Sequence, residues 1–137
     1  MEKFYSKTQP GILLHIVNRK SDITGRKDII DPDQFLQCSS INLDKGSTFR
    51  PHRHIWKKRD ESLVIAQESW VVISGSVKCF FYDLDDSLLA EVVLHPGDAS
   101  YTIEGGHNYE ILEDGTFVYE FKVGPYEGQS LDKHFIN

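Results

Sequence analysis

Short stretches rich in β-branched and aromatic residues recur along this chain at intervals of about 8–12 residues, with turn-forming residues between them. Strand-like segments are predicted at residues 11–17, 35–43, 47–54, 62–74, 76–83, 88–94, 99–103, 107–112 and 116–123. Turns are indicated at Ser74-Gly75, Asp83 to Ser87, Pro96-Gly97-Asp98, Gly105-Gly106 and Glu113-Asp114-Gly115. Because no long stretch has the apolar period of a helix, the pattern predicts an all-β sandwich or barrel.

The length of 137 residues fits one domain built around a single hydrophobic core. Residues 1–34 are predicted to form an N-terminal arm and loops. Within them, residues 1–10 are expected to be a loose arm or a short helix, and residues 18–34 loops with at most one short strand. Residues 124–137 are predicted to form a C-terminal tail, in which the stretch 129–137 is too short for a helix to be predicted or excluded.

Charge and apolar patterning argue against several classes of partner. The formal net charge is −6, and the basic run Lys57 to Arg59 is followed at once by Asp60 and Glu61, so a nucleic-acid partner is not expected. No apolar run is long enough for a membrane span, and the N-terminus lacks a signal-peptide core.

The chain has two cysteines, Cys38 and Cys79, which we expect to be buried free thiols in a cytoplasmic protein.

Two histidines one residue apart, His52 and His54, follow a proline within a predicted strand. Side chains alternate between the two faces of a strand, so both imidazoles project from the same face. Glu68 begins a later β-branched run that ends at Gly75, and His107 follows directly after two glycines. Three neutral imidazoles and one carboxylate suit a divalent first-row metal and leave coordination positions for water or substrate.

The order of these residues resembles the two sequence motifs of the cupin superfamily. The matching positions are Gly46, His52 and His54, then Glu68 and Gly75, then Pro96-Gly97-Asp98 and Gly105-Gly106-His107. The resemblance spans roughly residues 40–123 and implies a single-domain jelly-roll β-barrel, or double-stranded β-helix, with residues 40–123 as its core. It also implies one divalent transition metal ion (Fe, Mn, Ni or Zn) held by His52, His54, Glu68 and His107. Within the superfamily, the chain is most similar to small WbuC-like cupins, which are associated with bacterial surface-polysaccharide genes.

The chain departs from the family pattern between His54 and the acidic ligand. Thirteen residues separate His54 from Glu68, where the family usually has three or four, and Glu61 lies closer to His54. Glu68 is the preferred ligand, because its distance to Gly75 matches the family motif. The inserted residues 55–67 are then expected to form an extended hairpin or flap beside the barrel mouth. Glu104 also replaces a proline that is common in the family.

Strand alternation extends the predicted site beyond the ligands. If Glu68 points inward then so does Trp70, and if His107 points inward then so does Tyr109. These two aromatic residues either contact substrate or are simply core. Arg50, two residues before His52, either binds an anionic group of the substrate or pairs with an interior carboxylate.

The resemblance implies an enzyme that acts on a small polar substrate such as a sugar or nucleotide sugar, by isomerisation or epimerisation, in bacterial surface-polysaccharide metabolism. A cupin dioxygenase is an alternative, as is a non-catalytic ligand-binding or regulatory cupin. A metal-free epimerase with a histidine base and a tyrosine acid is a further alternative. Exposed sheet edges favour a homodimer.

Overall fold

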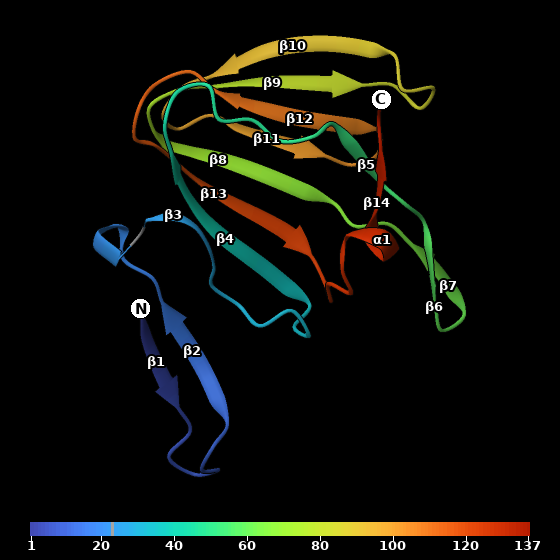
Figure 1. The fold of residues 1–137 in the computed structure, drawn as a ribbon. Coiled ribbons are helices and arrows are strands. Elements are labelled where there is room, and N and C mark those ends of the chain that lie inside the picture. The colour runs from blue at the N-terminus through green and yellow to red at the C-terminus, as the bar shows by residue number, and fades with distance from the viewer. Residues whose placement is uncertain (23) are drawn as a thin grey trace.

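The computed structural model describes residues 1–22 and 24–137, so the expectation for residue 23 lies outside the described residues. Figure 1 shows two facing β-sheets, with the N-terminal hairpin projecting away from them. The first five-stranded sheet has the order β10 (Leu88–Leu94), β9 (Val77–Tyr82), β12 (Gly106–Ile111), β5 (His52–His54) and β14 (Lys133–Phe135). The second has the order β11 (Ala99–Thr102), β8 (Glu68–Ser74), β13 (Thr116–Val123), β4 (Leu36–Leu43) and β3 (Gly25–Asp28).

The remaining elements are short. They are the hairpin of β1 (Glu2–Tyr5) and β2 (Leu13–Val17), the hairpin of β6 (Lys57–Arg59) and β7 (Ser62–Val64), a 3-10 turn η1 (Lys20–Asp22) and one helical turn α1 (Gln129–Asp132). The all-β prediction is confirmed. All strand pairs within the two sheets are antiparallel among the described residues. No helix in the described part of the chain is long and apolar enough to span a membrane.

The core lies between the two sheets, and alternation along the strands fills it. Trp70 and Val72 on β8 and Tyr109 and Ile111 on β12 are all buried. These residues follow the period of two that a strand with one inward face requires. They pack with residues contributed by β4, β9, β10 and β13: Ile41, Val77, Cys79, Leu94 and Val118. The predicted inward orientation of Trp70 and Tyr109 is therefore observed.

The two glycines before His107 allow the tail to reach the site. Gly105 has φ of +95°, which a residue with a side chain rarely adopts. A Cβ at Gly106 would overlap Cδ1 of Ile136 and Cβ of Tyr82. Glycine at this position lets the buried Ile136 of the C-terminal tail pack directly against the start of β12.

Three local expectations were wrong in detail. Residues 1–10 contain strand β1, which pairs with β2, rather than a loose arm or a helix. The predicted strand at 47–54 is reduced to His52–His54, preceded by an isolated bridge between Thr48 and Glu110. The 62–74 run divides into β7 and β8, because residues 55–67 form the expected hairpin insertion.

Candidate metal centre

Three imidazoles converge because two neighbouring strands bring them into register. His107 on β12 lies directly opposite His52 on β5, and the centroids of their rings are 4.7 Å apart. His54 lies two residues further along β5, so its side chain leaves the same face of the sheet. Its ring centroid is 5.5 Å from that of His52 and 5.6 Å from that of His107.

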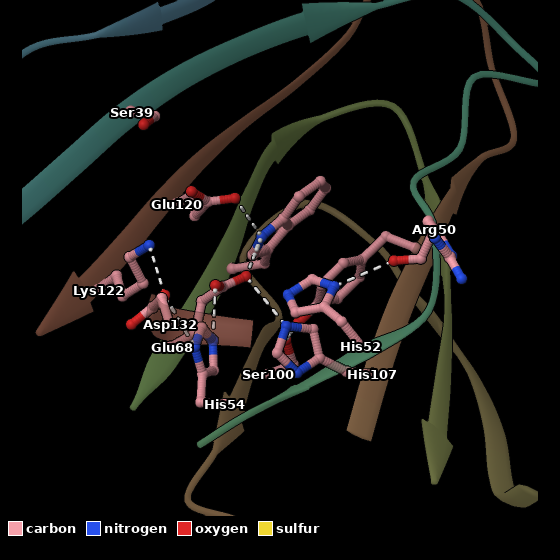
Figure 2. Close-up of polar contacts among 12 residues, drawn as sticks. Ser39, Arg50, His52, His54, Glu68, Ser100, His107, Glu120, Lys122 and Asp132 are labelled. Carbon is pink, nitrogen blue, oxygen red and sulfur yellow. Dashed lines mark hydrogen bonds and ion pairs between the residues drawn. The ribbon is translucent and has the colours of Figure 1, made fainter. Parts of the chain in front are cut away.

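Glu68 completes the cluster from the opposite sheet. As the first residue of β8, it places Oε2 3.2 Å from Nε2 of His54 and Oε1 3.2 Å from Nε2 of His107. One potential ligand atom from each of His52, His54, Glu68 and His107 lies within 4.8 Å of the others, and all four residues are buried. Figure 2 shows the four side chains pointing toward one another between the two sheets.

Hydrogen bonds outside the cluster orient two of the imidazoles. The Nδ1–H of His52 donates to the carbonyl oxygen of Arg50 at 3.0 Å, and the Nδ1–H of His54 donates to Oδ2 of Asp132 at 3.1 Å. Each bond fixes Nδ1 as the protonated nitrogen when the ring is neutral, so Nε2 is left to bind a metal. Such bonds both hold the ring and increase the basicity of the ligating nitrogen.

An unpaired nitrogen in the cluster indicates whether a metal ion fits there. Nε2 of His52 is buried and has no hydrogen-bond partner among the described residues. An unpaired buried nitrogen is costly, and a metal ion between the rings would satisfy it. Three imidazole nitrogens and one carboxylate oxygen are also a donor set that first-row divalent metals accept. The cluster fits such an ion.

The surroundings of the cluster favour an ionised Glu68 and a neutral His52, which are the forms in which these side chains bind a metal. Burial raises the pKa of Glu68, but hydrogen bonds from His107 and His54 outweigh it and hold that pKa well below its usual range. Burial, the charge of Lys133 and the charge of His107 lower the pKa of His52 to about 3, so His52 is neutral at pH 7. Burial lowers the pKa of His54, but hydrogen bonds to Asp132 and Glu68 raise it above its ordinary value.

Glu61 does not belong to the cluster. It is exposed in the turn between β6 and β7. Residues 57–64 form the β6–β7 hairpin, hereafter the flap, which lines a groove with Val123 and Pro125. A cavity of about 360 Å³ opens onto the cluster, and none of the residues that line it comes from the flap.

The predicted substrate-contacting residues all line this cavity. The rings of Trp70 and Tyr109 stack at 4.0 Å between centroids, and the Tyr109 hydroxyl shares a hydrogen bond with Ser100. Burial raises the pKa of Tyr109 above its ordinary value. Arg50 lies exposed at the rim, where it donates to Asn137 Oδ1 at 3.2 Å. The structure does not show the alternative pairing of Arg50 with an interior carboxylate.

A hydrogen-bonded chain that the sequence did not suggest runs from Glu68 to the cavity wall. The Trp70 indole N–H lies 3.2 Å from Oε1 of Glu68 and 3.1 Å from Oε2 of Glu120. Arg26 then donates to both oxygens of Glu120, at 3.0 and 2.6 Å. Glu68 and Glu120 are both buried acidic residues, and alternation along β13 could have placed Glu120 inward.

The C-terminal tail supplies the other residues that were missed. Asp132, fully buried, accepts hydrogen bonds from Lys57 Nζ at 2.6 Å and from Lys122 Nζ at 3.2 Å in addition to the bond from His54. Strand β14 pairs with β5 and brings Lys133 opposite His54 and Phe135 opposite His52. No sequence motif marks these tail residues. Their roles arise from the pairing of β14 with β5, a strand that is distant in the sequence.

Comparison with known proteins supports the fold. No protein-family model matches the sequence, and no curated protein matches it. KdgF from Halomonas sp. has a similar structure, with a TM-score of 0.55 and 21% identity over 90% of this chain and 89% of that chain. The capsular polysaccharide assembling protein CapF from Staphylococcus aureus gives a TM-score of 0.65 and 20% identity, over 82% of this chain and 31% of CapF.

A third similar structure is an uncharacterised conserved protein from Klebsiella pneumoniae with a double-stranded β-helix domain. It has a TM-score of 0.57 and 15% identity, over 82% of this chain and 83% of that protein. The chain has the cupin fold, as its sequence motifs predicted. At these identities the likeness is one of fold alone.

Proposed function

We propose that this protein is a metal-dependent cupin enzyme that isomerises or epimerises a small polar substrate such as a sugar or nucleotide sugar. The observation that carries the proposal is the buried cluster of three histidines and one glutamate, with an unpaired His52 Nε2, at the wall of a cavity of about 360 Å³. A buried charged cluster beside a concave pocket is a typical arrangement for a catalytic site.

His52, His54, Glu68 and His107 would hold the ion, which is one of Fe, Mn, Ni or Zn. When bound, such an ion acts as a Lewis acid that polarises a carbonyl or hydroxyl group of the substrate. The protein supplies the geometry, because Asp132 and the Arg50 carbonyl fix the rings of His54 and His52. The stacked pair of Trp70 and Tyr109 forms part of the cavity wall.

The sugar class of substrate is supported by two likenesses. The sequence resembles WbuC-like cupins of surface-polysaccharide gene clusters, and CapF, which shares the fold, is a capsular polysaccharide assembling protein. We therefore propose a role in bacterial surface-polysaccharide metabolism, in the cytoplasm, where activated sugars are made. Neither a nucleic acid nor a membrane is part of the proposal.

A homodimer is proposed as the functional assembly. An apolar patch on the second sheet includes Phe35, Leu36, Tyr101, Ile103 and Phe121, each at least one-third exposed. Contiguous apolar surface of this kind is common at protein interfaces. Light scattering coupled to size-exclusion chromatography would give the mass of a dimer, and Tyr101→Glu would shift it to that of a monomer.

A solvent-exchange assay tests the proposed reaction. Metal-loaded protein in deuterated water is incubated with a panel of sugars and nucleotide sugars. When a base removes the proton next to a carbonyl and a proton is returned to the resulting enediol, the carbon-bound hydrogen exchanges with solvent. We expect deuterium incorporation and a second sugar product by NMR, both lost after chelation. Protein that holds its metal and neither exchanges nor converts any sugar of the panel would contradict the proposal.

A further inference from the structure

Lys133 lies beside the candidate metal centre and forms no ion pair with any residue that the structure describes. It lies opposite His54 in the antiparallel pairing of β14 with β5, and directly opposite residues project from the same face of a sheet. Since His54 points inward to the cluster, Lys133 points to the same side, and it lines the cavity together with His52 and Glu68. Among the described residues, no ion pair or hydrogen bond is formed by its ammonium group.

The other charges around the cavity are accounted for. Arg26 is paired with Glu120 through two hydrogen bonds, and Lys122, in the adjoining cavity, is paired with Asp132. Arg50 meets only the neutral Asn137 amide and the face of the Phe135 ring, whose centroid is 4.5 Å from its guanidinium carbon. Glu68 would be neutralised by the ion. Lys133 and Arg50 thus line the cavity without a direct ion pair among the described residues, in a chain whose net charge is −6.

From this charge distribution we infer that the substrate is an anion of monosaccharide size, whose carboxylate or phosphate group binds Lys133 while its hydroxyl or carbonyl oxygens face the four-residue cluster. Lys133 is a specificity-determining residue in this arrangement, and Arg50 supports it from the rim. The inference rests on the proposed function, because it assigns the substrate class of the same site.

The dimensions of the site agree with this assignment. A cavity of about 360 Å³ falls at the small end of the usual range for ligand pockets, about 300–1,000 Å³, which suits a single sugar ring or an open-chain sugar. Phe135, opposite His52 on the adjacent strand, lies with its ring centroid 6.1 Å from that of His52. The guanidinium of Arg50 lies over the same Phe135 ring, so Arg50 stands at the exposed rim while Lys133 lines the cavity beside His52 and Glu68.

The test is a binding titration with three probes that differ in charge: gluconate, glucose 6-phosphate and neutral glucose. Metal-loaded wild type, Lys133→Met, Lys133→Arg and Lys58→Met are compared by calorimetry. Lys58 is exposed in the flap, outside the cavity, and its substitution makes the same change in net charge. Metal content and thermal unfolding are measured for every variant, to show that each is folded and loaded.

We expect the wild type to bind at least one of the two anions more tightly than glucose, and the preferred anion identifies a carboxylate or a phosphate substrate. Lys133→Met is expected to weaken that binding about tenfold or more, since a charge-assisted hydrogen bond is lost. Lys133→Arg should retain most of the affinity, and Lys58→Met all of it.

Wild type that binds neither anion, or binds glucose as tightly, overturns the inference. So does a Lys133→Met variant that holds its metal and binds the anion like wild type. Loss of the proposed function has a different signature: a protein that retains no metal, in wild type and variants alike. The metal measurement and the anion titration thus separate the two failures.

Discussion

The Nδ1–H of His54 donates to Oδ2 of Asp132 across 3.1 Å, and both side chains are almost wholly buried. This bond joins the candidate metal centre to the last helical turn of the chain. Through Asp132, the centre is also joined to Lys57 of the flap and to Lys122 of β13. The carboxylate of Asp132 thus links the His54 ring to the flap and to β13.

Asp132→Asn should weaken metal binding about 10- to 100-fold, which is the usual effect of removing a carboxylate that orients a histidine ligand. The amide keeps the size of the side chain but is a weaker acceptor for His54. Metal affinity is measured by competition with a chelator of known affinity. Asp31→Asn, an exposed change of the same chemistry, is the control. Equal affinity in wild type and Asp132→Asn would show that Asp132 does not act through His54.

Metal binding is expected to release protons. Both ring nitrogens of His54 lie within hydrogen-bond distance of carboxylates, Nδ1 at 3.1 Å from Asp132 and Nε2 at 3.2 Å from Glu68, and the bond to Glu68 requires a proton on Nε2. The same two bonds raise the pKa of His54 above its ordinary value in spite of burial. Metal must replace that proton, and metal affinity therefore falls as the pH falls. Calorimetry in buffers of different ionisation enthalpy measures the release, which should be smaller in Asp132→Asn. A binding enthalpy that is independent of the buffer would contradict this prediction.

The metal-free protein should lose stability as the pH falls from about 6.5 toward 3. Burial is the main cause of the lowered pKa of about 3 for His52, so the folded state keeps this ring neutral while the unfolded chain binds a proton. Below the unfolded pKa of about 6.5, only the unfolded chain binds this proton. The free energy of unfolding therefore falls by about 1.4 kcal/mol for each pH unit until the folded pKa is reached. Urea unfolding at pH 6.5 and 5.0 measures it. His52→Gln should lack this component, and an unchanged pH slope in that variant would refute the assignment.

The two thiols should be unreactive in the folded protein. Burial and the charge of Glu120 raise the pKa of Cys38 to about 11, and burial raises the pKa of Cys79 to about 12. Since the thiolate is the reactive form, both should alkylate far more slowly with iodoacetamide at pH 8 than after addition of denaturant. Mass spectrometry measures the labelling. Complete native-state labelling at the rate of an exposed thiol would be the contrary result. The structure confirms the predicted state, because both cysteines are buried and free.

Local rules were enough to predict the all-β class and the two convergent imidazoles of His52 and His54, and the resemblance to the cupin motifs added Glu68 and His107. Alternation on β5, β8 and β12 places His52, Glu68 and His107 inward, and this depends only on the period of a strand. The spacing from Glu68 to Gly75 was also informative, because Gly75 has φ of +78° and a Cβ there would overlap Thr116. A residue other than glycine would not fit this turn.

The rest of the site depends on contacts that are distant in the sequence. Asp132 lies 78 positions beyond His54, and its role arises from the pairing of β14 with β5. The tail has neither a clear period nor a motif, so its residues could not be assigned in advance. The flap was predicted as a hairpin. The sequence did not show that the flap lines a separate groove with Val123 and Pro125 and lies outside the cavity.

One metal ion is expected to bind to the cluster of His52, His54, Glu68 and His107. The most direct test is elemental analysis of protein purified without a metal-affinity tag, for wild type, His52→Ala, Glu68→Gln and the matched control Glu61→Gln. We predict close to one ion per chain for wild type and Glu61→Gln, and strong loss for His52→Ala and Glu68→Gln. Full metal content in His52→Ala or Glu68→Gln, or loss in Glu61→Gln alone, would contradict the account.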